Sequence, residues 1–301
     1  MHKYDIVILT EDRYDNNEPK DQNERDILIE DTLIKESFEK LGLRVYRTSW
    51  ANPNFDWAST KAAFFSTTWD YHFRYDEFMT WFKDVRNKCL LLNSYDTINW
   101  NLDKHYLNEL QEAGINTPES IFIEKGETTS LKTVYKNSGW NETVLKPIVS
   151  AGGRHTYRIN ENNLSEYEEL FTKLLAEEGL MLQEFQKNVI SKGEVAYMIM
   201  GETYTHAILK TAKKGDFRVQ DDFGGSLEVY IPSQKEIDFA TEALIKSGHK
   251  TTYARVDVIY DNNDQLSVSE LELMEPELWF RFDKPAADVL AKVVLKALNE
   301  L

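Results

Sequence analysis

The sequence contains very little cysteine and no long apolar run. Cys89 is the only cysteine among 301 residues, so no disulfide can form within the chain. It opens the apolar stretch 89–92, which predicts a buried strand and favours a core cysteine over a nucleophile. No apolar stretch approaches the roughly 20 residues of a membrane span, and residues 1–10 have the pattern of a strand rather than a secretion signal. We therefore expect a cytoplasmic protein without a membrane partner.

Positive charge is also scarce. The chain has 35 basic and 51 acidic residues, a net charge of −16, which would repel a phosphate backbone and predicts no nucleic-acid partner. A local basic pocket for a small anion remains compatible with this average. Hydrophobic residues make up 42% of the chain, enough for sizeable cores, and the length predicts two domains.

Short apolar stretches alternate with helical patterns in the first third of the chain. Strands are predicted at 5–9, from 45, at 62–66 and at 89–92, helices at 27–41 and 76–87, and a polar loop at 11–26. This alternation predicts a doubly wound parallel sheet, whose ligands bind beyond the carboxyl ends of the strands. Trp69, Asp70 and Tyr71 follow the third strand and are candidate substrate-binding residues. Alternatively, the aromatic residues are core residues and Asp70 caps a helix that begins near Tyr75.

The pattern changes near residue 100 to an α+β arrangement. Helices are predicted at 103–114, 164–178, 233–246 and 286–298, and strands at 120–123, 143–146, 253–260 and 265–273, with further strands through 180–229. We expect an N-terminal domain over residues 1–98 and a second domain with two subdomains over 99–301. Eight of the 13 glycines lie between Gly152 and Gly225, where the backbone must bend or approach a ligand closely.

A lysine at the end of an apolar strand leads directly into a flexible loop. Lys146 is followed by Ser150, Gly152, Gly153 and Arg154. Main-chain amides beside Lys and Arg are the groups that a polyphosphate needs. The alternative is an ordinary hairpin with a solvated lysine, and the GxxxxGK[ST] phosphate-loop pattern is absent.

Two further segments carry polar groups at predicted strand ends. Gln183, Glu184 and Phe185 end an apolar strand, where main-chain groups and a ring suit an adenine base. Lys210 and Arg218 add cations to an otherwise acidic chain. The alternative for the first segment is a strand end with ordinary polar residues. In the second segment we expect Lys213 and Lys214 to be solvated.

Three carboxylates occur in the last predicted strand pair. Asp257 lies in an apolar strand, and Glu270 and Glu272 are two residues apart, so they project from one face. Bare carboxylates about 4 Å apart repel by roughly 4 kcal/mol at an effective dielectric constant near 20, so this grouping requires a cation. Hard oxygen ligands suit Mg²⁺. The alternative is an alternating strand with both glutamates in water.

The order of these segments resembles the ATP-grasp superfamily, which includes D-alanine–D-alanine ligase, glutathione synthetase and ribosomal-protein glutamate ligases. A narrower likeness, to the D-cycloserine synthetase group, is carried by four motifs: 66–72 (Ser-Thr-Thr-Trp-Asp-Tyr-His), 99–104 (Asn-Trp-Asn-Leu-Asp-Lys), 215–225 and 270–276 (Glu-Leu-Glu-Leu-Met-Glu-Pro). The resemblance implies a pre-ATP-grasp domain followed by an ATP-grasp fold. One departure is that Glu272 stands where Asn is usual and Glu275 precedes the proline. This leaves open which of Glu270, Glu272 and Glu275 bind metal.

The resemblance also implies roles for individual residues. Those implied to bind ATP are Lys104, Lys146, Ser150, Gly152, Gly153, Gln183, Glu184, Phe185 and Glu194, the last at the ribose. Lys210, Arg218 and Arg255 are the implied catalytic residues, and Asp257, Glu270 and Glu272 the implied Mg²⁺ ligands. The implied reaction activates a carboxylate as an acyl phosphate that an amine attacks. The implied partner is an amino-acid-like small molecule, with a homo-oligomer also possible. A small-molecule kinase and a non-catalytic ATP-binding protein are the alternatives.

Overall fold

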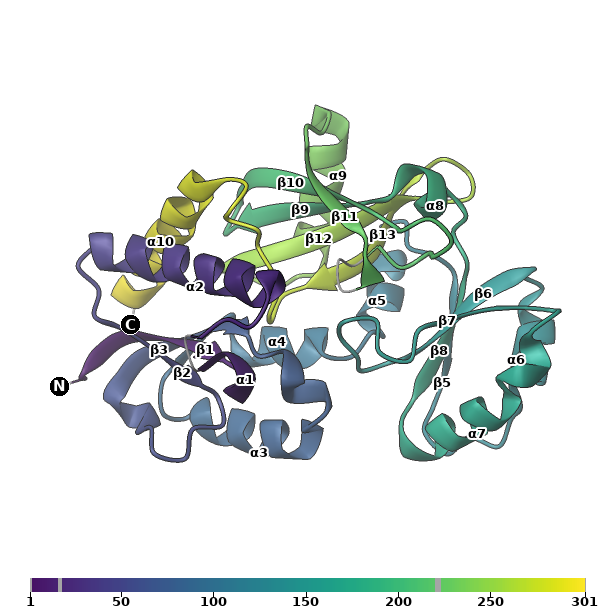
Figure 1. The fold of residues 1–301 in the computed structure, drawn as a ribbon, viewed down its shortest axis with the longest axis horizontal. Helices are drawn as coiled ribbons and strands as arrows, with labels where there is room; N and C mark the ends of the chain where they lie inside the picture. The colour runs from purple at the N-terminus through teal and green to yellow at the C-terminus, as the bar shows by residue number, and fades with distance from the viewer. Residues whose placement is uncertain (1, 16–17, 220–222, 301) are drawn as a thin grey trace.

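Three sheets organise the described part of the chain, residues 2–15, 18–219 and 223–300 of a computed structural model (Figure 1). The N-terminal sheet consists of β1 (Tyr4–Thr10), β2 (Val45–Ser49), β3 (Thr60–Thr67) and β4 (Leu90–Leu92). All its strands are parallel, in the order β2-β1-β3-β4. The predicted doubly wound sheet is therefore confirmed.

Helices cover both faces of this sheet because its central strand is apolar on both sides. Ile6 and Ile8 of β1 share a core with α2 (Gln22–Lys40), whereas Val7 and Leu9 share another with α3 (Tyr75–Val85). Residues buried on both faces give a continuous apolar run instead of an alternating one.

Three short helices were not predicted, two before residue 102 and α8 (Asn188–Lys192), which lies where strands were expected. The expected polar loop at 11–26 contains α1 (Asp12–Asp15) and the first turn of α2, where the Asp21 carboxylate accepts a 2.9 Å hydrogen bond from the Glu24 amide. Residues 16 and 17 lie outside the described residues. The second helix, α4 (Tyr95–Asn101), has Ser94 as its N-cap and precedes α5 (Tyr106–Glu112). Helices of four to seven residues are too short for apolar periodicity to reveal, even where a residue such as Ser94 caps them.

The central sheet is antiparallel, in the order β5-β8-β6-β7. Its strands are β5 (Ser120–Ile123), β6 (Glu142–Pro147), β7 (Tyr157–Asn160) and β8 (Leu180–Glu184). The helices α6 (Leu131–Ser138) and α7 (Glu168–Glu177) bury their apolar sides against it. The predicted helix at 164–178 begins with a separate 3₁₀ turn, Leu164–Glu166.

The C-terminal sheet is also antiparallel, in the order β11-β10-β9-β12-β13. Its strands are β9 (Glu194–Met200), β10 (Thr203–Thr211), β11 (Ser226–Tyr230), β12 (Tyr253–Tyr260) and β13 (Leu266–Glu272). The helices near this sheet are α8 (Asn188–Lys192), α9 (Gln234–Lys246) and α10 (Lys284–Asn299).

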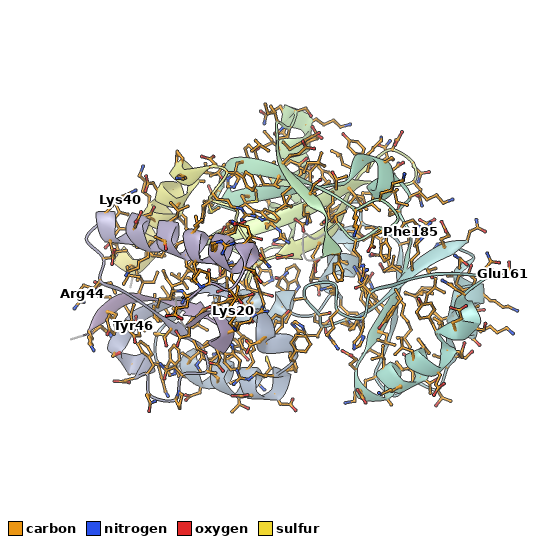
Figure 2. All side chains as sticks on the ribbon, viewed as in Figure 1. Lys20, Lys40, Arg44, Tyr46, Glu161 and Phe185 are labelled. Carbon is orange, nitrogen blue, oxygen red and sulfur yellow. The ribbon has the colours of Figure 1, made fainter. Side chains whose placement is uncertain are left out.

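The first and third sheets are joined by a shared core. The helix α10 lies beside α2 (Figure 1), and Leu290 of α10 packs in one cluster with Ile8 and Phe64 of the N-terminal sheet and Met198 of β9. Charged side chains such as Lys40, Arg44 and Glu161 lie at the periphery, whereas Phe185 lies between the central and C-terminal sheets (Figure 2). Among the described helices, none has the length and apolarity needed to cross a membrane.

Candidate active site

A cavity of about 930 Å³ lies where the three sheets meet, and all the candidate site residues predicted above line it. They reach it from the loops after β3, β6 and β10, from the segment between α4 and α5, from the end of β8, and from β6, β9, β10, β12 and β13. Lys213 and Lys214, expected to be solvated, do not line it. Segments up to about 200 residues apart in the sequence therefore contribute to a single site.

The three predicted metal ligands meet on one wall. Asp257 and Glu270 are paired across β12 and β13, and carboxylate oxygens from these residues and Glu272 all lie within 4.8 Å of one another. Leu271 and Leu273 point into the core, so the alternation of β13 sends the glutamates into the cavity. Glu275 is not part of this group. The donor set fits a hard divalent cation such as Mg²⁺.

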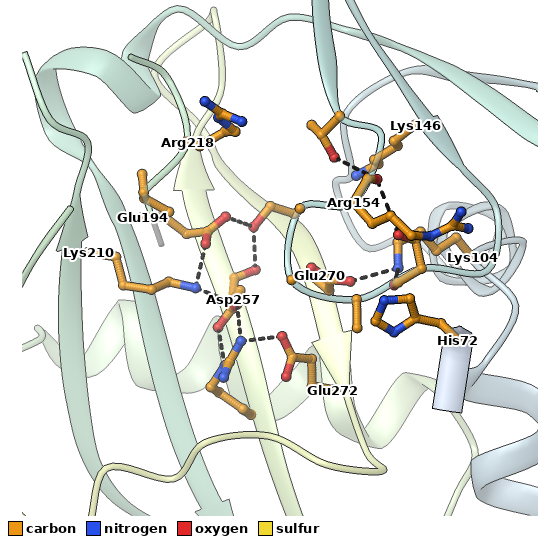
Figure 3. Close-up of a pocket in the computed structure, with 18 of the residues that line it drawn as sticks. His72, Lys104, Lys146, Arg154, Glu194, Lys210, Arg218, Asp257, Glu270 and Glu272 are labelled. Atoms are coloured by element: carbon orange, nitrogen blue, oxygen red, sulfur yellow. Dashed lines mark hydrogen bonds and ion pairs between the residues drawn. The ribbon is translucent and has the colours of Figure 1, made fainter. Parts of the chain in front are cut away.

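Cationic side chains neutralise these carboxylates (Figure 3). Lys210 Nζ lies 2.6 Å from Asp257 and 2.5 Å from Glu194, and Lys104 Nζ lies 2.8 Å from Glu270. Arg255 binds Asp257 with its Nε at 3.0 Å and also pairs with Glu272. Lys210 and Arg255 thus meet on one carboxylate, and a bound metal would have to share these oxygens with them.

The same charges shift the pKa values of the two glutamates on this wall in opposite directions. Burial raises the pKa of Glu270, but Lys104 and Lys146 outweigh this and hold it at about 2. Burial and the neighbouring Asp257 and Glu270 raise the pKa of Glu272 to about 7, against the opposing charge of Arg255. Burial has the opposite effect on a cation, so it lowers the pKa of Lys146, and the nearby charge of Lys104 lowers it further. Lys146 has no ion pair with any described residue, which leaves its ammonium group available to an anion.

The glycine loop lies against Lys104. Gly152 and Gly153 have φ values of +59° and +69°, which favour glycine, and Lys104 Nζ donates a 2.8 Å hydrogen bond to the Ser150 carbonyl. Arg154 is held by both carboxylate oxygens of Glu178. The loop therefore presents its main chain and Ser150 to the cavity, with its arginine anchored at the side.

The β8 end of the cavity carries the residues expected near adenine. The Gln183 side chain donates to Ser120 Oγ at 2.9 Å, and Phe185 is 3% exposed. Arg158 lies over the Phe185 ring, 4.0 Å from its centroid. The amides of Glu184 and Phe185 pair with carbonyls of Glu119 and Glu142. Their carbonyls also accept hydrogen bonds, from the side chains of Gln186 and Asn262 respectively, so a ligand would share these groups.

Arg218 does not join Lys210 and Arg255. It forms an ion pair of 2.8 Å with Asp216, which with neighbouring amides holds the pKa of that carboxyl well below its ordinary value. Figure 3 shows its guanidinium apart from the Lys210–Asp257 network. Glu194, expected at the ribose, lies between Lys210 and Ser269, whose hydroxyl donates to it at 2.6 Å.

The N-terminal end of the cavity is lined by residues 69–73, by Glu275, Glu277 and Trp279, and by Glu11 and Arg13. Trp69 Nε1 donates to the Glu275 carbonyl at 2.9 Å, and Tyr71 is buried. Asp70 accepts hydrogen bonds from Trp50 Nε1 at 2.7 Å and Arg74 at 3.0 Å. The N-cap of α3 is Arg74, without a side-chain capping bond. The alternative use of Asp70 as a helix cap is therefore wrong.

Among the cavity residues to which sequence reasoning assigned no role, two lie beside the charged groups. His72 lies beside Lys104 and Arg154 (Figure 3), and burial together with these two charges lowers its pKa to about 4, so its ring is neutral. Trp279 lies over two cations: its ring centroid is 4.9 Å from Arg255 Cζ and 5.9 Å from Lys210 Nζ. The only sequence feature that could have indicated either residue is that His72 directly follows Trp69, Asp70 and Tyr71.

Two antiparallel sheets that enclose one cavity, with lysines and a glycine loop on one side and carboxylates on the other, define a nucleotide-binding ligase fold of the ATP-grasp class. The chain belongs to the ATP-grasp family: the model described as the prokaryotic glutathione synthetase ATP-grasp domain matches residues 116–269. The model described as the N-terminal domain of the D-cycloserine synthetase DcsG matches residues 6–93. This confirms the prediction of an enzyme of the ATP-grasp class, carbon–nitrogen ligases that form ADP.

Individual relatives agree with this assignment. The Streptomyces lavendulae cycloserine biosynthesis protein DcsG is 22% identical over 286 residues, 88% of this chain and 93% of the relative. The crystal structure of D-cycloserine synthetase DcsG has a TM-score of 0.85 at 22% identity, covering 97% of this chain and 99% of the other. D-alanine–D-alanine ligase from Bacillus anthracis, complexed with ATP, has a TM-score of 0.68 at 12% identity, covering 99% and 98%. At these identities the structures show a common fold.

Proposed function

We propose that the protein is a Mg²⁺-dependent ligase that uses ATP to activate a carboxylate, or an equivalent oxygen, and joins it to an amine. The observation that carries this proposal is that Asp257, Glu270 and Glu272 meet beside four cations in one cavity. The cations are Lys104, Lys146, Lys210 and Arg255. Mg²⁺ held by carboxylates, with lysines around it, is what a transferring phosphoryl group requires.

The chain's own residues bind and orient ATP in this proposal. Lys104 and Lys146 bind phosphate oxygens under the loop Ser150–Gly153, while Gln183, Glu184 and Phe185 hold the adenine and Glu194 the ribose. Lys210, Arg218 and Arg255 stabilise charge on the transferring phosphoryl group. Asp257, Glu270 and Glu272 would hold Mg²⁺, which would supply positive charge against the phosphate groups when bound.

The proposed reaction has two steps. The substrate oxygen attacks the γ-phosphorus, the bond to the β–γ bridging oxygen breaks, and ADP leaves. The amine then attacks the acyl carbon, the bond to the phosphate oxygen breaks, and inorganic phosphate leaves as the nitrogen loses a proton. Trp69, Asp70 and Tyr71 would contact the acceptor, an amino-acid-like small molecule, since they line the N-terminal end of the cavity. The proposal also places the protein in the cytoplasm and the boundary between its two domains at residues 98 and 99.

Phosphate release distinguishes this proposal from its rivals. Amino acids and amines are screened with Mg-ATP while ADP and inorganic phosphate are both measured. A ligase forms the two in equal amounts and only with substrate present. A small-molecule kinase forms ADP without free phosphate, and a non-catalytic ATP-binding protein forms neither. Lys146→Met should abolish release, since it removes the unpaired cation that we assign to the phosphates.

A further inference from the structure

The charged groups at the N-terminal end of the cavity are paired, with one exception. Glu11 pairs with Arg13 at 2.6 Å, Asp70 with Arg74 at 3.0 Å, and Glu277 with Arg281. Glu275 lines the same end, yet within the described ranges its carboxylate has no ion-pair partner. Burial disfavours the charged form of the partly buried Glu275 when no ligand is bound, and a cationic ligand would supply the missing counter-charge.

The surroundings of Glu275 are fixed by groups from both domains. Its carbonyl accepts the Trp69 indole N–H at 2.9 Å, and the carbonyl of the preceding Met274 accepts the Tyr253 hydroxyl at 2.6 Å. Glu275 lines the cavity together with Trp69, Tyr71 and Trp279. A carboxylate in a cavity lined by aromatic side chains is suited to an ammonium group, which both the charge and the ring faces attract.

A second group at this end also has no protein partner. Trp279 is 4% exposed, lines the cavity, and its indole Nε1 has no hydrogen-bond partner in the structure. Its φ of +47° is rare for a bulky side chain, and such backbone strain concentrates at ligand sites. Within the described residues Glu275 lacks a cationic partner and Trp279 Nε1 lacks an acceptor, so a ligand that carries both an ammonium group and an oxygen acceptor would complement them.

We propose that Glu275 binds the ammonium group of the acceptor substrate and thereby makes the enzyme selective for primary amines over their hydroxyl counterparts. This rests on the proposed function, because it places the amine next to the carboxylates that hold the nucleotide. The competing role, a further metal ligand, is disfavoured by geometry: Asp257, Glu270 and Glu272 form a close group that does not include Glu275.

The test uses matched probes on the whole protein saturated with Mg²⁺ and a non-hydrolysable ATP analogue. Calorimetry first measures the affinity for the analogue, and then the affinities for alaninamide and serine and for their hydroxyl counterparts lactamide and glycerate. The wild-type protein should bind each amine about 10- to 100-fold more tightly than its counterpart, the usual effect of one charge-assisted hydrogen bond. Glu275→Gln should abolish this preference. Glu202→Gln, which removes the same charge from an exposed turn, should keep it.

The outcomes separate this inference from the proposed function. If the nucleotide analogue does not bind, the proposed function fails and the inference with it. If the analogue binds but amines and counterparts bind equally, or none binds at roughly 10 mM, a concentration suited to weak ligands, only the inference fails. It also fails if Glu275→Gln raises the Mg²⁺ concentration needed for nucleotide binding by about tenfold, since that is the behaviour of a metal ligand.

Discussion

Glu272 is the most informative residue for the metal site. Burial and the nearby Asp257 and Glu270 raise its pKa to about 7, so its charged form is costly in the metal-free protein. Glu272→Gln should reduce turnover at least about 100-fold, because a metal ligand is lost, while the metal-free fold keeps or slightly gains stability. Phosphate release and urea unfolding in EDTA measure the two effects. Near-normal turnover would remove Glu272 from the ligand set and leave Glu275 as the replacement.

The candidate residues could be predicted because each lies at a strand end within a distinctive local pattern. Lys146 before the glycine loop and Glu270 and Glu272 on alternate positions of β13 are examples. Trp279 could not be predicted in this way. Its role depends on stacking over Arg255 and on a loop conformation with positive φ, and neither has a sequence pattern of its own.

Gly193 sets the geometry at the start of β9. It has a φ of +73°, and a Cβ there would lie 2.4 Å from the carbonyl oxygen of Lys210 on the adjacent strand. Gly193→Ala should therefore lower the free energy of unfolding by more than roughly 2 kcal/mol. Gly139→Ala is the control. Gly139 ends α6 with a φ of +72°, but a Cβ there would have no atom within 4 Å, so we expect a loss of about 1 kcal/mol in the free energy of unfolding. Equal losses in urea unfolding would show that the close approach to Lys210 does not matter.

Elements with a clear apolar run followed from sequence, including the four-residue β5 at its predicted bounds, 120–123. β12 has the predicted bounds, 253–260, because it is an uninterrupted run of buried residues beside a clear helix. β7 has four residues with only Ile159 fully buried, so it offers no alternation, and its pairing with β6 depends on a loop that bends at glycines. Tertiary pairing rather than local pattern determines such elements.

At the scale of the whole molecule, buried carboxyl groups make stability depend on pH. Burial is the largest cause that raises the pKa of Glu272 to about 7 and those of Glu30 and Glu275 to about 8, from an ordinary value of 4.5. The folded state therefore binds more protons than the unfolded state between these values. The stability that these groups contribute is highest below about pH 4.5 and falls as the pH rises to about 8.

The melting temperature in EDTA should therefore decrease from pH 6 to pH 9, as thermal unfolding at constant ionic strength will show. Each group contributes at most about 1.4 kcal/mol per pH unit. Glu270 acts in the opposite direction: its pKa of about 2 stabilises the fold above 4.5, and this stabilisation is lost as pH falls toward 2. A melting temperature that rises between pH 6 and pH 9 would be incompatible with three protonated carboxyl groups in the fold.

The central claim, that the cavity binds Mg-ATP, is tested most directly by unfolding the protein with and without this ligand. Binding to the folded state alone should raise the free energy of unfolding by about 2.7 kcal/mol when free Mg-ATP is a hundredfold above its dissociation constant. Lys146→Met should lose most of this gain, because Lys146 is the cation in the cavity that no described carboxylate pairs. A folded wild-type sample whose free energy of unfolding does not change with millimolar Mg-ATP would contradict the account.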